Sequence, residues 1–352
     1  MHKAWGIAIP GLLLVGAAVL RYYDPAPIQN VRNFVFDNFQ RISPREYDPT
    51  LPVRIAEIDE KSLEKFGQWP WSRATMAQVI DRLRDLGAAV VALDVLYPEP
   101  DRTSPTAIVA SMPNDPALDG IKAEMMKLPD PDRILAKSLS EVNSVVSFAY
   151  LTNDPRRAEA PLIKKYDIVA QGADPSASVE AAAFALGGAY YTASLPMLQE
   201  AATGIGAVNA GEPDPDGVIR RVPLVVQIKG VLYPTLTTEA LYRAIGGNTP
   251  FIKLAGATGA FSFGTSTGAA KMRIGQLIVQ PTANIQLLLY DTGAEPRRYV
   301  SIADLFEPDF DFGLYQISLC HDCASVTKSS SSFRCVWIEA FLRKKEVCRS
   351  SD

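Results

Sequence analysis

Four carboxylates stand at or just after the ends of two strands that the sequence predicts. The predicted strands are the apolar segments Val53 to Ile58 and Ala88 to Leu96. In open α/β sheets, ligands bind in the crevice beyond the carboxyl ends of the strands. The carboxylates that this rule selects as candidate ligand-binding residues are Asp59, Asp94, Glu99 and Asp101.

Two tryptophans and an arginine lie between those strands. Trp69 and Trp71 flank a proline, and Arg73 follows them. Indole faces and a guanidinium in the same crevice would offer stacking surfaces and a cation to a ligand. In the structural alternative, the indoles cover the end of the sheet, and Arg73 pairs with Asp94 or Glu99 to hold two loops together. The structural alternative is the simpler one, and both stay open.

One pattern suggests a hydrolase. Gly264 to Gly268 matches the G-x-S-x-G turn that presents a nucleophilic serine. Such a serine needs a histidine base, and the only two histidines are His2, beside an apolar N-terminal run, and His321, in an unusual tail. The sequence therefore predicts no serine hydrolase, and we expect no enzyme.

Signals for cofactors and metals are incomplete. The Gly204 to Gly206 segment begins a dinucleotide fingerprint, but Asn209 stands where its third glycine belongs. Asp214 and Asp216 resemble a calcium loop that lacks its downstream glutamate, and with the following glycine they are more simply a turn. We therefore expect neither a cofactor nor a metal.

The first 21 residues differ from the rest of the chain. Ala4 to Leu20 is an uncharged apolar run, which as a helix would extend about 25 Å, near the lower limit for crossing a bilayer. The run predicts a single transmembrane anchor, and the alternative is a cleavable signal peptide. Either one places the bulk of the chain outside the cytoplasm, most simply in the periplasm at the inner membrane. The absence of cysteine before Cys320 agrees with this location.

Composition limits the number of domains and the classes of partner. The chain has 352 residues, 47% of them hydrophobic, and a formal net charge of -4. These values are typical of one large or two small globular domains and give no basic footprint for nucleic acid.

Periodicity predicts the elements that position the candidate residues. Pro27 to Ile42 has an amphipathic helical pattern, and Arg73 to Leu86 is a second helix between the two strands, which makes a βαβ unit. Thr103 to Pro131 is a Pro- and Asp-rich surface insertion, and Thr235 to Ile245 is a further helix. The predicted fold class is α/β, with a mixed, largely parallel sheet flanked by helices and an N-terminal transmembrane helix.

Residues 313–352 form a tail of different character. All four cysteines and a run of four serines lie in it. Its Cys320 to Cys323 segment has the CxxC start of a zinc site, but Cys335 and Cys348 are too far apart to close one. We interpret the tail as an out-of-frame or degenerate end.

Several strings, in order, resemble the second class of CHASE domains, the extracellular sensory modules associated with cyclases and histidine kinases. They are Val53 to Leu63, Gly67 to Arg73, Asp94 to Asp101, Gly206 to Asn209, Pro213 to Gly217, Arg220 to Leu224, Leu277 to Tyr290 and Tyr299 to Leu305. The resemblance covers about residues 25–312, and because the family has no agreed ligand, no binding residues are carried over from it. Asn209 is a further candidate ligand-binding residue. The resemblance implies a membrane helix, an α/β sensor, returning membrane helices and a cytoplasmic output domain. The closing core strand that it implies after Phe312 is not evident in the tail.

These observations together predict a membrane-anchored, extracytoplasmic sensory domain of a bacterial receptor of the adenylate cyclase or histidine kinase type, here without its output domain. The alternatives are a periplasmic partner-binding module and a periplasmic hydrolase. The expected partners are the lipid bilayer, an unknown small-molecule or protein stimulus and a second copy of the chain, but no nucleic acid.

Overall fold

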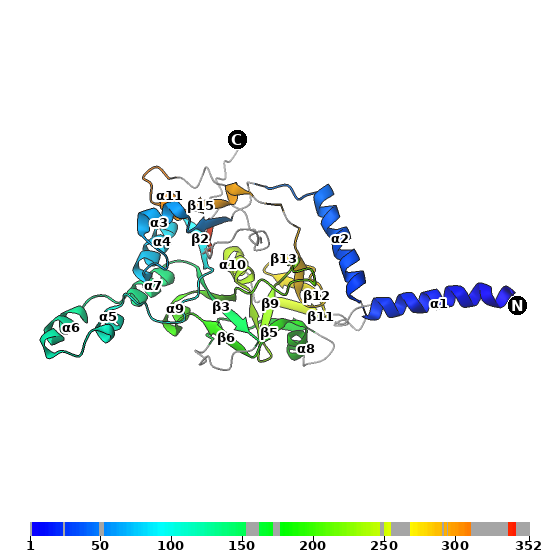
Figure 1. Ribbon diagram of the computed structural model, residues 1–352, viewed down its shortest axis with the longest axis horizontal. Helices are drawn as coiled ribbons and strands as arrows, with labels where there is room; N and C mark the ends of the chain where they lie inside the picture. Colours follow the sequence, from blue (N-terminus) through cyan, green and yellow to red (C-terminus); the bar gives the residue numbers. More distant parts are fainter. Residues whose placement is uncertain are drawn as a thin grey trace, which may run out of the picture.

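A computed structural model describes residues 2–23, 25–48, 53–152, 162–171, 177–246, 250–254, 268–290, 292–293, 295–310 and 337–342. An α/β body carries two N-terminal helices at one side and a helical protrusion at the other (Figure 1). The predicted α/β class, with sheets flanked by helices, is confirmed.

The main sheet contains seven strands among the described residues. In spatial order they are β15 (Tyr299–Ser301), β1 (Arg54–Glu57), β16 (Trp337–Leu342), β2 (Ala88–Leu93), β3 (Ser144–Leu151) and β6 (Tyr190–Ala193), with β7 (Gly204–Ala207) also paired to β3. The pairs β1–β15, β2–β3 and β3–β7 are parallel, and β1–β16, β16–β2 and β3–β6 are antiparallel. The main sheet is thus mixed, as predicted, but it is not largely parallel, because half of its described strand pairs are antiparallel.

Strand β16 corrects the expectation that the tail supplies no core strand. It lies between β1 and β2 and runs antiparallel to both, so that Ile55 pairs with Glu339 and Val91 pairs with Ala340. The predicted βαβ unit is therefore present but split by a strand from the far end of the chain. Local periodicity could not reveal this insertion, because strand pairing over such a separation leaves no local pattern.

Helix α4 (Arg73–Asp85) connects β1 to β2. The Ser72 side chain caps its N-terminus by accepting a hydrogen bond from the Ala74 N–H. Met76, Val79, Ile80 and Leu83 form one apolar face and are fully buried. The helix is followed by Gly87, whose φ of 85° suits glycine. Burying this face against the sheet keeps the start of α4 beside the loop that follows β2, where the Arg73 N–H donates to Asp101.

Other helices cover the two faces of the main sheet. On the side of α4 lie α3 (Glu60–Phe66), α7 (Pro131–Ser140) and α11 (Ile302–Leu305), with α9 (Pro196–Ala201) beside α7. Helix α10 (Leu236–Ile245) packs on β2, β3 and β7 from the other side (Figure 1). The buried residues between these layers form one large apolar core.

Smaller sheets pack beside α10 around a second apolar core. Their strands are β10 (Val231–Pro234), β9 (Val225–Ile228) and β5 (Leu186–Gly188); β13 (Leu277–Val279), β12 (Ala269–Ile274), β11 (Phe251–Leu254) and β4 (Val169–Gln171); and β14 (Gln286–Leu288) with β8 (Arg221–Pro223). Helix α8 (Ala177–Phe184) covers this core, and the short helix η2 (Pro296–Arg298) leads back to β15.

The predicted surface insertion is a helical protrusion. Its elements are α5 (Pro105–Ser111), η1 (Pro116–Leu118) and α6 (Asp119–Met125). They project from the body on the side opposite to the N-terminal helices (Figure 1). The excursion expected from Thr103 to Pro131 is therefore confirmed.

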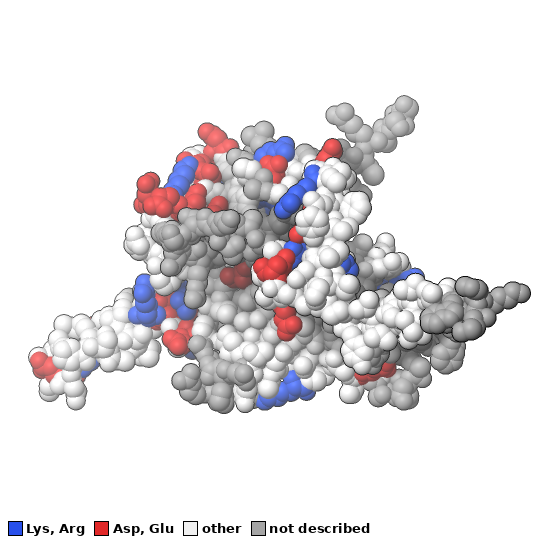
Figure 2. All heavy atoms as spheres, turned by 45° about the vertical axis from the view of Figure 1, so that its right-hand side comes forward, with Lys and Arg blue, Asp and Glu red and all other residues white. Residues whose placement is uncertain are grey.

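The N-terminal segment forms helices α1 (His2–Tyr23) and α2 (Ala26–Ile42), with Pro25 at the N-cap of the second. Leucines 12, 13 and 14 are 68–78% exposed, and the described surface of α1 is almost free of charge (Figure 2). Among the helices that the structure describes, none is both long enough and apolar enough to span a bilayer. The predicted transmembrane span is therefore not confirmed.

Candidate functional site

The predicted ligand-binding residues do not form a single site. Trp69, Trp71, Arg73, Glu99 and Asp101 come together where α4 begins. The other three candidate residues stand apart from this group in their contacts; they are Asp59, Asp94 and Asn209.

Asp101 is the centre of the first group. One of its carboxylate oxygens accepts hydrogen bonds from the Arg73 N–H at 2.6 Å and the Ser72 hydroxyl at 3.0 Å. The other accepts the N–H and the hydroxyl of Thr103, both at 2.8 Å. Burial raises the pKa of Asp101, but these hydrogen bonds outweigh it and the net pKa is lowered. With 1% of its surface exposed, Asp101 is a buried anion whose oxygens are already occupied by the chain.

Arg73 completes what we call the sheet-end cluster, namely Ser72, Arg73, Tyr97, Asp101 and Asp132. Its guanidinium carbon lies 4.5 Å from the centre of the Tyr97 ring, and its Nε lies 3.6 Å from Asp132 Oδ1. A terminal nitrogen also donates to the backbone carbonyl of Glu99 at 3.1 Å. The expected ion pair with Asp94 or with the Glu99 carboxylate is therefore wrong, because Asp132 from α7 supplies the counter-charge.

The two tryptophans pack on each other and on the body. Trp71 is 4% exposed, and its ring centre lies 5.2 Å from that of Phe66 and 5.8 Å from that of Trp69. Its indole N–H donates to the Gly67 carbonyl at 2.7 Å. The buried indole of Trp71 is thus engaged inside the protein, while Trp69 stays partly exposed.

Asp59 and Asn209 each hydrogen-bond to a segment distant in the sequence. Asp59 caps α3 by accepting the Ser62 N–H at 2.9 Å, and it also accepts the Ser301 hydroxyl at 2.8 Å. The Asn209 amide accepts the Tyr150 N–H at 2.9 Å and donates to the Tyr150 carbonyl at 3.2 Å. Both side chains hold strands or helices in place.

Asp94 is different, because it is partly buried without a partner. It follows β2, and within the described part of the chain its carboxylate makes no hydrogen bond or ion pair. Burial raises its pKa from 3.8 to about 6. Glu99, by contrast, is an exposed carboxylate at the edge of the sheet-end cluster.

A second charged cluster attaches α2 to the body, and we call it the Arg220 clamp: Asp37, Asp214, Asp216 and Arg220. Arg220 is 5% exposed, and its Nε and one terminal nitrogen bind the two oxygens of Asp37 at 2.9 and 2.7 Å. It also donates to Asp214 at 3.0 Å and to Asp216 at 2.8 and 2.6 Å. Such paired contacts match the planar guanidinium to carboxylates and give a strong, directional attachment.

The charges of the clamp stabilise one another. Hydrogen bonds from Arg220 lower the pKa of Asp37 and bring that of Asp216 to about 2, and bonds to the three aspartates raise the pKa of Arg220. Asp37, Asp216 and Arg220 are therefore ionised at neutral pH. Asp214 also pairs with Arg221 at 2.5 Å, so it belongs to both the clamp and the surface beside it.

Helix α2 meets the body with its polar side. Asn33 is 4% exposed, and Gln40 donates to the Leu289 carbonyl at 3.1 Å. The apolar stripe instead faces outward: Val31, Phe34 and Phe39 are 62–67% exposed. An amphipathic pattern alone suggests the reverse, with the apolar side buried against the body.

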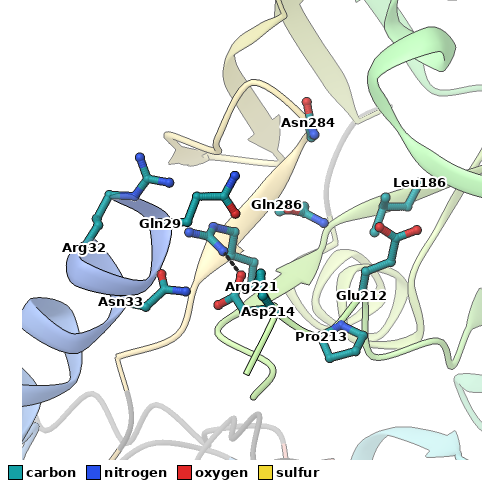
Figure 3. Close-up of a pocket in the computed structure, with 11 residues that line it drawn as sticks. Gln29, Arg32, Asn33, Leu186, Glu212, Pro213, Asp214, Arg221, Asn284 and Gln286 are labelled. Atoms are coloured by element: carbon teal, nitrogen blue, oxygen red, sulfur yellow. Dashed lines mark hydrogen bonds and ion pairs between the residues drawn. The ribbon is translucent and has the colours of Figure 1, made fainter. Parts of the chain in front are cut away.

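A polar cleft of about 520 Å³ lies between α2 and the body (Figure 3). Its lining residues are Gln29, Arg32, Asn33, Leu186, Glu212, Pro213, Asp214, Pro215, Arg221, Asn284 and Gln286. Asn33 reaches from α2 toward Arg221 and Asp214, and Glu212 stands on the far side (Figure 3). On the surface, acidic and basic side chains gather at a hollow near the middle of the molecule (Figure 2).

Sequence reasoning missed this second cluster. The signal for it was the acidic turn at Pro213 to Gly217 followed by Arg220 and Arg221, because Asp216 and Arg220 are four residues apart. The turn itself is confirmed, since the Gly217 N–H donates to the Asp214 carbonyl at 2.8 Å. The partner on α2, Asp37, is 183 residues from Arg220 and has no local signature.

The remaining motifs have structural explanations or lie outside the described residues. A Cβ on Gly204 would lie 2.2 Å from the Glu239 side chain, and one on Gly206 would lie 2.5 Å from Leu236 Cα. Both glycines therefore allow α10 to approach β7 closely. Residues 264–267 of the G-x-S-x-G pattern and the four tail cysteines are outside the described part of the chain.

Comparison with known proteins gives one family. A family model described as the CHASE2 domain matches residues 11–322. The comparisons with curated proteins and with solved structures gave no match.

Proposed function

This chain belongs to the CHASE2 domain family, and from that premise we propose that it is the extracytoplasmic sensory module of a membrane-attached bacterial receptor. The receptor's output is of the adenylate cyclase or histidine kinase type. The observation that carries the proposal is the extent of the family match, which runs from within α1 through α2 and through the body as far as α11, with β16 outside it.

The attachment of α2 supports a sensory role. A receptor needs an element that has two arrangements of similar free energy and that connects the sensor to the membrane. Helix α2 follows the apolar helix α1 directly and contacts the body through polar side chains, above all Asp37 on Arg220. We propose that a stimulus changes how firmly α2 is held and that α1 attaches this movement to the bilayer.

A second copy of the chain is the partner we propose for the outer face of α2. Ile28, Val31, Val35 and Ile42 follow the spacing of a coiled-coil seam, and all are at least 43% exposed. Two α2 helices packed along this seam would bring two sensor bodies side by side. Sedimentation of the detergent-solubilised full chain should therefore give a dimer, and Val35→Asp should give a monomer. Val218→Asp, at an exposed valine in a loop, is the matched control, and a monomeric wild type would contradict the pairing.

Export and membrane attachment are tested with the full chain fused at its C-terminus to a phosphatase that is active only outside the cytoplasm. We expect phosphatase activity in the membrane fraction after a carbonate wash. Leu13→Arg, which places a charge in α1, should move the protein to the soluble fraction, and the exposed Leu128→Arg in the protrusion should not. Recovery of the wild-type fusion as an inactive, soluble cytosolic protein would overturn the proposal.

A further inference from the structure

Two buried side-chain amides in the cleft have no hydrogen-bond partner. Asn33 is 4% exposed and Gln286 is 8% exposed, and neither amide makes a hydrogen bond within the described part of the chain. Although these residues are largely buried, their amide atoms are not shielded from solvent, so they present free donors and acceptors to the open cleft. Both amides line the same cleft from opposite elements, Asn33 from α2 and Gln286 from β14.

The cleft also holds charges of both signs. Arg221 uses one terminal nitrogen for Asp214, which leaves other N–H donors of its guanidinium for a ligand. Glu212 lies across the cleft, is exposed, and makes no hydrogen bond or ion pair among the described residues. A carboxylate on the ligand fits Arg221, and an ammonium fits Glu212.

The size and lining of the cleft limit the ligand further. A volume of about 520 Å³ lies in the range of small-molecule sites, roughly 300–1,000 Å³. None of the described residues that line the cleft is aromatic, so they offer no stacking surface for a base. The amides supply both donors and acceptors beside the two charges.

We propose that this cleft binds a small zwitterion of the amino-acid type, with its carboxylate on Arg221, its ammonium on Glu212 and its polar groups on Asn33 and Gln286. This deepens the proposed sensory function and rests on it for its biological meaning. Binding can nevertheless fail while export and membrane attachment succeed, so the two proposals are tested separately.

The position of the cleft explains how such a ligand would act on α2. Gln29 and Asn33 belong to α2, whereas Arg221 and Gln286 belong to the body. Asp214 lines the cleft and also holds Arg220, which holds Asp37 of α2. A ligand bound between these walls adds contacts that exist only when α2 is docked, and it therefore favours the docked arrangement.

The test is calorimetric titration of the detergent-solubilised full chain with serine, asparagine and glutamine. Propionate, which lacks the amine, and ethanolamine, which lacks the carboxylate, are the control ligands. We expect at least one amino acid to bind and to raise Tm, and the two control ligands to bind at least tenfold more weakly. If none of the three amino acids binds, or if the control ligands bind equally well, the proposed ligand class is wrong.

Three variants separate a binding role from a structural one. Gln286→Leu removes an amide that has no partner among the described residues, so it should keep or raise Tm while weakening binding at least tenfold. Asn209→Leu removes an amide that bonds the backbone of Tyr150, so it should lower Tm and leave binding unchanged. Glu212→Gln should abolish the preference for the amino acid over propionate. Unchanged binding in Gln286→Leu, or a loss of Tm equal to that of Asn209→Leu, would overturn the site.

Discussion

The sheet-end cluster and the Arg220 clamp are both built on an arginine whose side chain is largely buried, 12% exposed for Arg73 and 5% for Arg220. They differ in what their carboxylates bind. Asp101 accepts two backbone N–H groups, from Arg73 and Thr103, and so organises the chain around it. Arg220 joins α2 to the body through side chains alone, across 183 residues of sequence.

This difference shows how one fold can combine a rigid part, the sheet-end cluster, with a part that can be released, helix α2 held by the Arg220 clamp. Breaking the sheet-end cluster frees buried backbone groups at the start of α4, which amounts to unfolding that end of the sheet. Breaking the clamp requires only that Asp37 leave Arg220, while Asp214 and Asp216 still hold the cation. Helix α2 can therefore separate from the body without loss of the core, as a switching element must.

The largest effect is expected at the sheet-end cluster. Asp101→Ala removes four hydrogen bonds to a buried carboxylate and leaves two backbone donors unpaired. We expect the free energy of unfolding to fall by about 3–4 kcal/mol, measured by urea denaturation. Glu99→Ala, at the exposed neighbour, is the control and should change it by less than about 0.5 kcal/mol. A loss below about 1 kcal/mol for Asp101→Ala would mean that the cluster is not the rigid part.

The next effect is expected at the clamp and should be local. Arg220→Gln leaves three carboxylates facing one another, so α2 should detach with a local cost of about 2 kcal/mol. Hydrogen exchange of the α2 amides should then be about 30-fold faster, while exchange in β2 and β3 stays unchanged.

Arg84 offers a matched control for the clamp, because it also faces three carboxylates, those of Asp81, Asp85 and Glu141. The Arg84 side chain is 32% exposed, so its ion pairs are weak. Arg84→Gln should therefore change the hydrogen-exchange rates of the surrounding backbone amides by less than about threefold. If Arg220→Gln accelerated hydrogen exchange equally in α2 and in the core strands, α2 and the core would unfold together. The contrast between the clamp and the sheet-end cluster would then be lost.

The sequence predicted the rigid part better than the releasable one, for a physical reason. The period-3.6 stripe of Met76, Val79 and Leu83 predicted α4 to within one residue of its observed end. The expected partners of Arg73, namely Asp94 and the Glu99 carboxylate, were wrong, because Asp132 comes from a distant helix. Contacts between distant segments leave no such pattern, so β16 between β1 and β2 was missed. Helix α2 was found, but its polar side binds the body, which amphipathicity does not suggest.

A pH titration should distinguish Asp94, which follows β2 outside the sheet-end cluster, from the clamp, because the pKa of Asp94 is raised whereas those of Asp37 and Asp216 are lowered. Burial raises the pKa of Asp94 to about 6, so between pH 4 and 6 the folded protein keeps a proton that the unfolded chain has lost. This residue therefore destabilises the fold progressively as the pH rises through that window. Asp94→Asn should be more stable than wild type by about 1–2 kcal/mol at pH 7.5 and equal to it below pH 4, by urea denaturation. A destabilised Asp94→Asn at pH 7.5 would point to a partner for the carboxylate.

The smallest effect is expected from trimming the clamp at its exposed member. Asp216 is 42% exposed, and Asp216→Asn removes its charge while Arg220 keeps its ion pairs with Asp37 and Asp214. The free energy that holds α2 on the body should therefore fall by at most about 0.5 kcal/mol. Because Arg220 lowers the pKa of Asp216 to about 2, wild-type attachment should persist as the pH falls through 4 and be lost toward pH 2. The variant should lose α2 protection at a higher pH in the same hydrogen-exchange series. If both proteins release α2 at the same pH, Asp37 alone governs the clamp, and the contrast with the sheet-end cluster rests on a single ion pair.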